Sequence, residues 1–107
     1  IKKNYKKTVL IDLHGYTLEE ANKKIEKFIK NAHENNIYKI IVVTGKGIHS
    51  QSQKNPYVSK DLSILKYSVP EFISNNKSLM NLIIQIEEAK IEDGGSGAFY
   101  LYLKKKW

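Results

Sequence analysis

The stretch TVLIDLHGYTLEEANKKIEKFIKNAHENNIYKIIVV, residues 8–43, contains a complete strand–helix–strand pattern. In residues 8–13 the side chains alternate, which predicts a strand with Ile11 and Asp12 on opposite faces. Residues 38–43 form a nearly continuous apolar run rich in β-branched side chains, which is typical of a central strand covered on its faces. Because short connections join the two strands through a helix, we expect a βαβ unit with parallel strands.

The helix of this unit is predicted over residues 18–34. Thr17 and Glu20 have the spacing of a capping box, in which each side chain accepts a hydrogen bond from the backbone amide of the other residue. One apolar stripe at helical spacing follows, formed by Leu18, Ala21, Ile25, Phe28, Ile29 and Ala32. Asn35 and Asn36 then end the helix.

A second helix is expected after a long polar loop over residues 45–60. Loops of this length in small domains are usually functional or mobile. Asp61 is the predicted N-cap, and Pro70 should kink the helix or mark the start of its last part. Its apolar side consists of Leu62, Leu65, Val69, Phe72 and Ile73.

The rest of the chain is predicted to complete the sheet. Residues 82–91 and 98–103 are the next two strands, and residues 94–97 (GGSG) form a tight hairpin link between them. The order βαβαββ indicates an α/β fold, a two-layer sandwich of a four-stranded mixed sheet with both helices on one face. We expect residues 1–7 to be a basic disordered lead-in and residues 8–107 to form a single domain.

The composition excludes several classes of protein. With 107 residues, 41% of them hydrophobic, the chain has enough apolar sequence for one globular domain. It has no cysteine, so disulfides, thiolate nucleophiles and cysteine-based zinc sites are excluded. No apolar run is long enough for a membrane span and no signal peptide is recognisable, so the cytoplasm is the expected compartment. The chain begins with Ile1 instead of methionine, which indicates a trimmed chain or a fragment.

The charge predicts a polyanionic partner. The net charge is +7 and the pI is about 9.5, which favours nucleic acid, the ribosome or an acidic membrane. All basic residues are lysine. The abundance of lysine, isoleucine and asparagine is typical of an AT-rich coding sequence, which explains the lack of arginine but not the sign of the charge.

Asp12 and His14 are the first candidates for chemistry, at the carboxyl end of the first strand. Open α/β sheets bind ligands at this edge. The strand period puts the two residues on one side, separated by about 7 Å of strand rise. Histidine moves protons near neutral pH, and a carboxylate nearby can orient it. Gly15 allows a sharp turn or the close approach of a phosphate. The alternative is that Asp12 and His14 only cap the following helix.

Two glycine-bearing loops are the next candidates. The first follows the second parallel strand and consists of Thr44, Gly45, Lys46 and Gly47. Its amides and its ammonium group are suited to an anion, although a plain turn is an equal alternative and the Walker A pattern is absent. His49 is either a substrate contact or a solvated loop residue. In the second loop, Gly95 and Gly97 serve either a tight turn or a close approach to a phosphate.

Together these motifs resemble the small MutS-related (Smr) domain family. The resemblance rests on DLHG at residues 12–15, TGKGIHS at 44–50 and GGSGA at 94–98, and it covers residues 8–103. It implies a βαβαββ sandwich with endonuclease activity. Members of the family nick DNA or cleave RNA, in some cases at stalled or collided ribosomes.

The resemblance also implies roles for single residues. Asp12 and His14 stand at the catalytic DxH motif, and Thr44, Gly45, Lys46 and Gly47 stand at the glycine loop. Further predicted contacts to substrate or its phosphates are Gly15, His49, Lys60, Lys66, Gly95 and Gly97. The chain departs from the family twice: Glu92 and Asp93 precede the glycine pair where a histidine is common, and Lys66 stands near a usual arginine. Lysine keeps the charge but loses the bidentate fork on a phosphate.

The resulting hypothesis is a phosphodiesterase acting on RNA, with DNA as the less favoured substrate. His14 would be the general base or acid, Asp12 would orient it or hold a divalent ion, and Lys46 would stabilise the phosphorane with the loop amides. RNA supplies its own 2′-hydroxyl nucleophile and needs no metal, whereas water attack on DNA favours an ion such as Mg²⁺. The alternative is a non-catalytic module that binds RNA, DNA or the ribosome. No membrane partner is expected, and the oligomeric state stays open.

Overall fold

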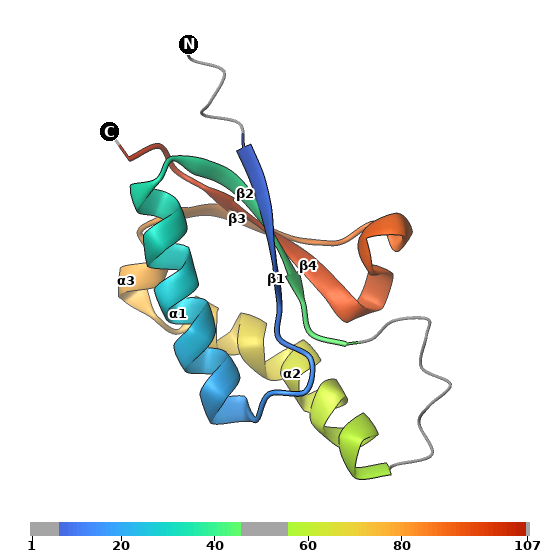
Figure 1. Cartoon of the computed structure of the whole chain (residues 1–107). Coiled ribbons are helices and arrows are strands. Elements are labelled where there is room, and N and C mark those ends of the chain that lie inside the picture. The colour runs from blue at the N-terminus through green and yellow to red at the C-terminus, as the bar shows by residue number, and fades with distance from the viewer. Residues whose placement is uncertain (1–6, 46–55, 107) are drawn as a thin grey trace.

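The computed structural model describes residues 7–45 and 56–106 (Figure 1). The strands are β1 (Lys7–Asp12), β2 (Ile37–Val43), β3 (Ile83–Glu88) and β4 (Ala98–Leu103). The α-helices are α1 (Leu18–Glu34), α2 (Pro56–Ser74) and α3 (Lys77–Met80). Lys7, placed in the predicted lead-in, already belongs to β1; the rest of that lead-in lies outside the described residues.

The four strands form one mixed sheet in the order β1-β2-β4-β3. β1 pairs with β2 in parallel, and β4 is antiparallel to both β2 and β3. Asp12 is opposite Val43, which in turn is opposite Ala98. The carboxyl ends of β1 and β2 and the amino end of β4 therefore meet at one edge of the sheet. The predicted parallel pair and mixed sheet are confirmed.

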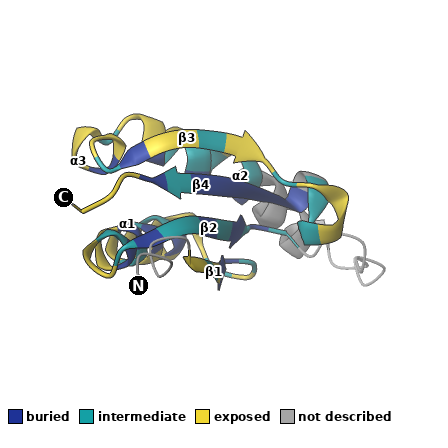
Figure 2. Ribbon diagram, turned by 90° about the horizontal axis from the view of Figure 1, so that it is seen from above, coloured by how far each residue is buried: buried dark blue, intermediate teal, exposed yellow. Residues whose placement is uncertain are grey.

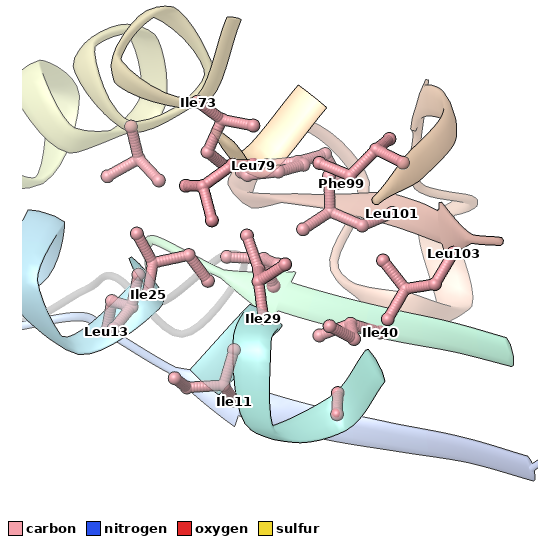
Figure 3. Packing of buried hydrophobic residues seen from close by; sticks show 14 of the residues in the cluster. Ile11, Leu13, Ile25, Ile29, Ile40, Ile73, Leu79, Phe99, Leu101 and Leu103 are labelled. Atoms are coloured by element: carbon pink, nitrogen blue, oxygen red, sulfur yellow. The ribbon is translucent and has the colours of Figure 1, made fainter. Parts of the chain in front are cut away.

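The helices cover one face of the sheet, and the core lies between the two layers (Figures 1 and 3). In β4, Phe99, Leu101 and Leu103 all belong to this core. On the opposite face Leu10 is 56% exposed. In Figure 2, β4 is buried over most of its length, whereas the edge strand β3 is largely exposed. The predicted two-layer sandwich is confirmed.

Helix α1 begins and ends as its sequence predicts. The Thr17 Oγ1 accepts from the Glu20 amide at 3.2 Å, and a Glu20 carboxylate oxygen accepts from the Thr17 amide at 3.0 Å. The buried positions follow the predicted stripe: Ala21, Ile25, Ile29 and Ala32. Asn35 is the C-cap. Local sequence is sufficient here because the capping box and the stripe indicate the same helix.

Helix α2 starts earlier than predicted. It begins at Pro56, so Asp61 lies inside the helix and is not its N-cap, and the predicted loop does not extend to residue 60. Proline suits the first helical turn because its φ is preset and its missing amide hydrogen has no intrahelical partner there. The helix also continues through Pro70 to Ser74. Residues 46–55 of the predicted loop lie outside the described part of the chain.

The sandwich carries three α-helices where two were predicted. The additional helix, α3, is a single turn capped by Asn76, whose side chain accepts from the Leu79 amide at 3.2 Å. Leu79 is fully buried in the core. One turn offers no repeating apolar stripe, so periodicity could not indicate it.

The predicted antiparallel pairing of β3 and β4 is confirmed, but the predicted end of β3 and the tight link between the two strands are wrong. β3 ends at Glu88, not at residue 91, and the link contains two 3₁₀ turns, Ile91–Asp93 and Gly95–Gly97, in place of a tight turn. Gly94 has a φ of +119° between them. Its amide donates to the Ile91 carbonyl, and the Gly97 amide donates back to Gly94. The glycines thus end and restart helical turns and do not form a two-residue turn.

Within residues 7–45 and 56–106, no helix is long and apolar enough to cross a membrane.

Candidate functional site

Asp12 and His14 are in direct contact. The Asp12 Oδ1 lies 2.7 Å from the His14 Nδ1 and also accepts the His14 backbone N–H at 3.1 Å. The expected strand spacing does not apply, because β1 ends at Asp12 and the chain turns, with the Tyr16 amide donating to the Leu13 carbonyl. The side chains of His14 and Asp12 are 37% and 46% exposed. A substrate therefore has access to both, and the N-cap of α1 is Thr17, not either of them.

This contact fixes the chemistry of the imidazole. A carboxylate accepts the Nδ1–H of His14, which selects the tautomer whose Nε2 carries a free lone pair. The second bond, from the His14 amide to the same oxygen, holds the carboxylate in place. The pair is thus arranged as a base and its orienting group.

Gly15 makes the turn after His14 with a φ of +88°. A side chain is rarely stable in this left-handed region, so glycine serves the turn between β1 and α1. A β-carbon built on Gly15 would meet nothing within 4 Å. The space on that side of Gly15 is therefore open.

The two glycine loops meet at the Gly97 carbonyl. This oxygen accepts from the amides of Thr44 and Gly45 at 2.8 and 3.1 Å, and from the Thr44 Oγ1 at 3.3 Å. Thr44 is 1% exposed, so its hydroxyl acts within the fold. The Gly45 amide, predicted to face a phosphate, is engaged by Gly97. A bond of 2.7 Å from the Leu13 amide to the Val43 carbonyl joins this assembly to the Asp12–His14 turn.

Lys66 lies at the same end of the molecule. It lines a cavity of about 250 Å³ together with Thr44, Pro70 and Ala98, among other residues of α2, β3 and β4. Its Nζ is 5.4 Å from the centre of the Tyr67 ring. Lys60 belongs to α2, and Gly95 to the second 3₁₀ turn. The remaining predicted contacts, Lys46, Gly47 and His49, lie outside the described residues.

A tyrosine network was missed by sequence reasoning. The Tyr100 hydroxyl donates to the Asp93 carboxylate at 2.5 Å and accepts from the Lys90 amide at 3.1 Å. The bond to Asp93 raises the pKa of Tyr100. Lys39 lies over the Tyr100 ring, 3.9 Å from its centre. Asp93, directly before the glycine pair, therefore ties the link to β4, and only the folded chain reveals this pairing.

Tyr102 should make the fold sensitive to alkali. Burial and a 3.0 Å bond to Glu87 raise its pKa from 10.0 to about 12. The folded state keeps the Tyr102 proton to a higher pH than the unfolded state does. The contribution of Tyr102 to the free energy of unfolding is therefore complete below pH 10 and is lost between pH 10 and 12. Urea unfolding across this range should show the decline, and Tyr102→Phe should lessen it. An equal decline in the variant would contradict this assignment.

In the part of the chain that the structure describes, no group of three or more His, Cys, Asp or Glu side chains is placed to hold a metal ion. Asp12 was the predicted ligand if a divalent ion is bound. Its Oδ1 already has two partners, both on His14.

Comparisons with known proteins identify the same family as the motifs. The Smr domain family model matches residues 11–104. An uncharacterized protein of Treponema pallidum (strain Nichols) is 30% identical over 95 residues, which cover 89% of this chain and 41% of that protein. Endonuclease MutS2 of Finegoldia magna is 28% identical over 94 residues, 88% of this chain and 10% of that protein. The chain thus spans less than half the length of either relative.

The fold agrees with a solved structure. The crystal structure of the Smr domain of Thermus thermophilus MutS2 matches with a TM-score of 0.64 and 19% sequence identity. The match covers 89% of this chain and 96% of that one. The predicted α/β architecture is therefore that of a known Smr domain.

Proposed function

Because this chain belongs to the Smr domain family, we propose that it is an endonuclease that cleaves RNA. The observation that carries the proposal is the exposed contact of 2.7 Å between Asp12 and His14. An imidazole held by a carboxylate, accessible at the ligand-binding edge of an α/β sheet, is suited to proton transfer at a phosphodiester. The Finegoldia magna relative carries the name endonuclease, which supports this class of reaction.

RNA is the preferred substrate because it supplies its own nucleophile. The Nε2 of His14 takes the proton of a 2′-hydroxyl. The 2′-oxygen then bonds to the adjacent phosphorus while the bond from phosphorus to the 5′-oxygen breaks. The leaving oxygen takes a proton from solvent, which gives a 2′,3′-cyclic phosphate and a 5′-hydroxyl end. DNA lacks the 2′-hydroxyl and would need an activated water.

The glycine loops and lysines handle the phosphate. Lys46 and the Gly47 amide stabilise the charge that develops on the phosphorane. Gly45 acts indirectly, because its amide holds the start of this loop on the Gly97 carbonyl. Lys66 and Lys60 attract flanking phosphates, with His49, Gly15 and Gly95 as further contacts. The cellular setting we propose is RNA at stalled or collided ribosomes in the cytoplasm.

The test is a cleavage assay on end-labelled RNA and DNA with EDTA or Mg²⁺. Wild type is compared with His14→Ala, and with His33→Ala as a matched histidine control on α1. Wild type and His33→Ala should cut RNA in EDTA, whereas His14→Ala should bind RNA without cutting it. An RNA with one 2′-deoxy sugar should resist cleavage at that sugar.

Three outcomes would overturn parts of the proposal. If His14→Ala cuts as fast as wild type, His14 is not the base. If only DNA is cut, and only with Mg²⁺, the substrate and the nucleophile are both wrong. If wild type binds RNA but never cuts it, the chain is a binding module, which is the second candidate that the charge of +7 favours.

A further inference from the structure

Two adjoining hollows follow helix α1 beside the edge strand β1. One, of about 470 Å³, is lined by Tyr16, Glu20, Lys23, Lys24, Glu26 and Lys27. The other, of about 570 Å³, is lined by Ile11, Lys24, Lys27, Phe28 and Asn31. Both hollows are lined by Lys24 and Lys27, so they are neighbours on the surface of α1. We call the two together the α1 groove and define it by these residues.

The α1 groove carries unneutralised positive charge. Lys23, Lys24 and Lys27 are exposed, and none of them forms an ion pair with any residue in 7–45 or 56–106. The two acids in the groove are already engaged. Glu20 accepts from the Thr17 amide at 3.0 Å, and Glu26 pairs with Lys30 at 3.3 Å. Glu26 is neutralised by Lys30, whereas Glu20 keeps its charge, so three ammonium groups face the charge of one carboxylate and the groove stays positive.

The spacing of these lysines makes them repel one another. Lys27 is three residues from Lys24 and four from Lys23, so both pairs are neighbours on the helix surface. Like charges at these spacings destabilise a helix unless an anion lies between them. Lys24 also lies over the Tyr16 ring, 5.6 Å from its centre, which holds its charge beside the turn between β1 and α1.

The groove leads to the proposed reaction centre. Tyr16, which lines one of the hollows, follows His14 by two residues in the turn between β1 and α1. A polyanion on the lysines would thus continue towards the exposed imidazole. A repeating phosphate chain fits this arrangement, because it offers a row of charges to a row of ammonium groups.

We propose that the α1 groove holds the sugar–phosphate backbone of the RNA beside the scissile bond, on Lys23, Lys24 and Lys27. The inference rests on the proposed function and adds to it the path of the substrate. The charged contacts are lysines, which bind phosphates without reading bases. The groove therefore supplies affinity and register at any sequence, and the Asp12–His14 pair supplies the reaction.

The test measures binding apart from cleavage. In the His14→Ala background, anisotropy of a fluorescein-labelled single-stranded RNA gives Kd over a series of NaCl concentrations. Lys24→Ala/Lys27→Ala is compared with Lys77→Ala/Lys104→Ala, which removes the same charge from α3 and from the residue that follows β4. All four side chains are exposed, and alanine favours helix, so the variants should fold; circular dichroism checks this.

The groove variant should bind RNA about tenfold more weakly at low salt. The slope of log Kd against log salt should fall by about 1.4, because each phosphate contact on a single strand contributes about 0.7. The control pair should change neither value by a comparable amount. Equal losses in both pairs would show a diffuse charge effect and overturn the inference, as would an unchanged slope in the groove variant.

Cleavage with His14 restored separates this inference from the proposed function. The groove variant should raise KM about tenfold and leave kcat nearly unchanged, because the lysines bind the RNA equally strongly in the ground state and in the transition state. If wild type cleaves RNA and the groove variant matches it in KM and Kd, the groove inference alone fails. If wild type does not cleave, the proposed function fails, and the anisotropy series still decides whether the groove binds phosphates.

Discussion

Asp12→Ala is expected to slow RNA cleavage by about 10²- to 10⁴-fold, nearly as much as loss of His14 itself. One carboxylate oxygen holds both the ring Nδ1 and the backbone amide of His14, at 2.7 and 3.1 Å. Without it, the ring loses the partner that selects its tautomer and its direction. Single-turnover rates at saturating protein, in EDTA and in Mg²⁺, measure the loss.

Two further variants make this prediction specific. Asp12→Asn keeps an oxygen that accepts from Nδ1 but lacks the negative charge, so its rate should lie between those of wild type and Asp12→Ala. Glu71→Ala removes an exposed carboxylate from α2 and should leave the rate unchanged. RNA affinity should hold or increase in all three, because each removes a negative charge. If Asp12→Ala keeps the wild-type rate in EDTA and loses only stimulation by Mg²⁺, Asp12 is a metal ligand and does not orient His14.

The first half of the fold could be predicted because its signals are local. Thr17 and Glu20 bond to each other within one turn, and the apolar stripe of α1 repeats along a single helix. The parallel pairing of β1 and β2 follows from the length of the helix between them. The family resemblance came from short motifs, and the Smr family match over residues 11–104 confirms it.

The parts that sequence reasoning missed depend on contacts across the chain. Leu79 on α3 stands next to Met80 with no repeating stripe around it, and only the finished core shows that Leu79 is fully buried. The bond from Tyr100 to Asp93 crosses from β4 to the link, so neither residue signals the other. Asp12 and His14 were predicted on the same side of the strand, but with the separation of two residues in an extended strand. Their direct contact was not predicted, because the sequence does not show that β1 ends at Asp12.

The glycine link, residues 94–97, depends both on local sequence and on a contact with a distant part of the chain. Its composition predicted a tight turn, whereas the chain forms two 3₁₀ turns joined at Gly94, which has a φ of +119°. The identity of its partner was not predictable, because the Gly97 carbonyl joins Thr44 and Gly45, which are far away in the sequence. The link therefore supports the start of the loop after β2. Its glycines affect the candidate site indirectly, because they hold Thr44 and Gly45 in place.

Gly94→Ala is accordingly expected to lower the free energy of unfolding by about 2–5 kcal/mol, the combined range for a left-handed residue and for overpacking. The new β-carbon would lie 2.7 Å from the Cβ of Ala98, at a φ of +119°. To relieve this contact, Ala98 or Gly97 must move, and with them the carbonyl that holds Thr44 and Gly45. Cleavage should fall along with stability. Urea denaturation and the RNA cleavage assay measure the two effects.

Gly95→Ala is the matched control for this prediction. Gly95 also has a positive φ, +52°, but a β-carbon there would meet its nearest atom, on Ile91, at 3.9 Å. It should lose only about 1–2 kcal/mol, the cost of the left-handed conformation alone. Ala98→Gly combined with Gly94→Ala removes the clash and should recover stability relative to Gly94→Ala. If Gly94→Ala and Gly95→Ala lose the same stability, or if the double variant recovers none, the contact with Ala98 does not determine the conformation of the link.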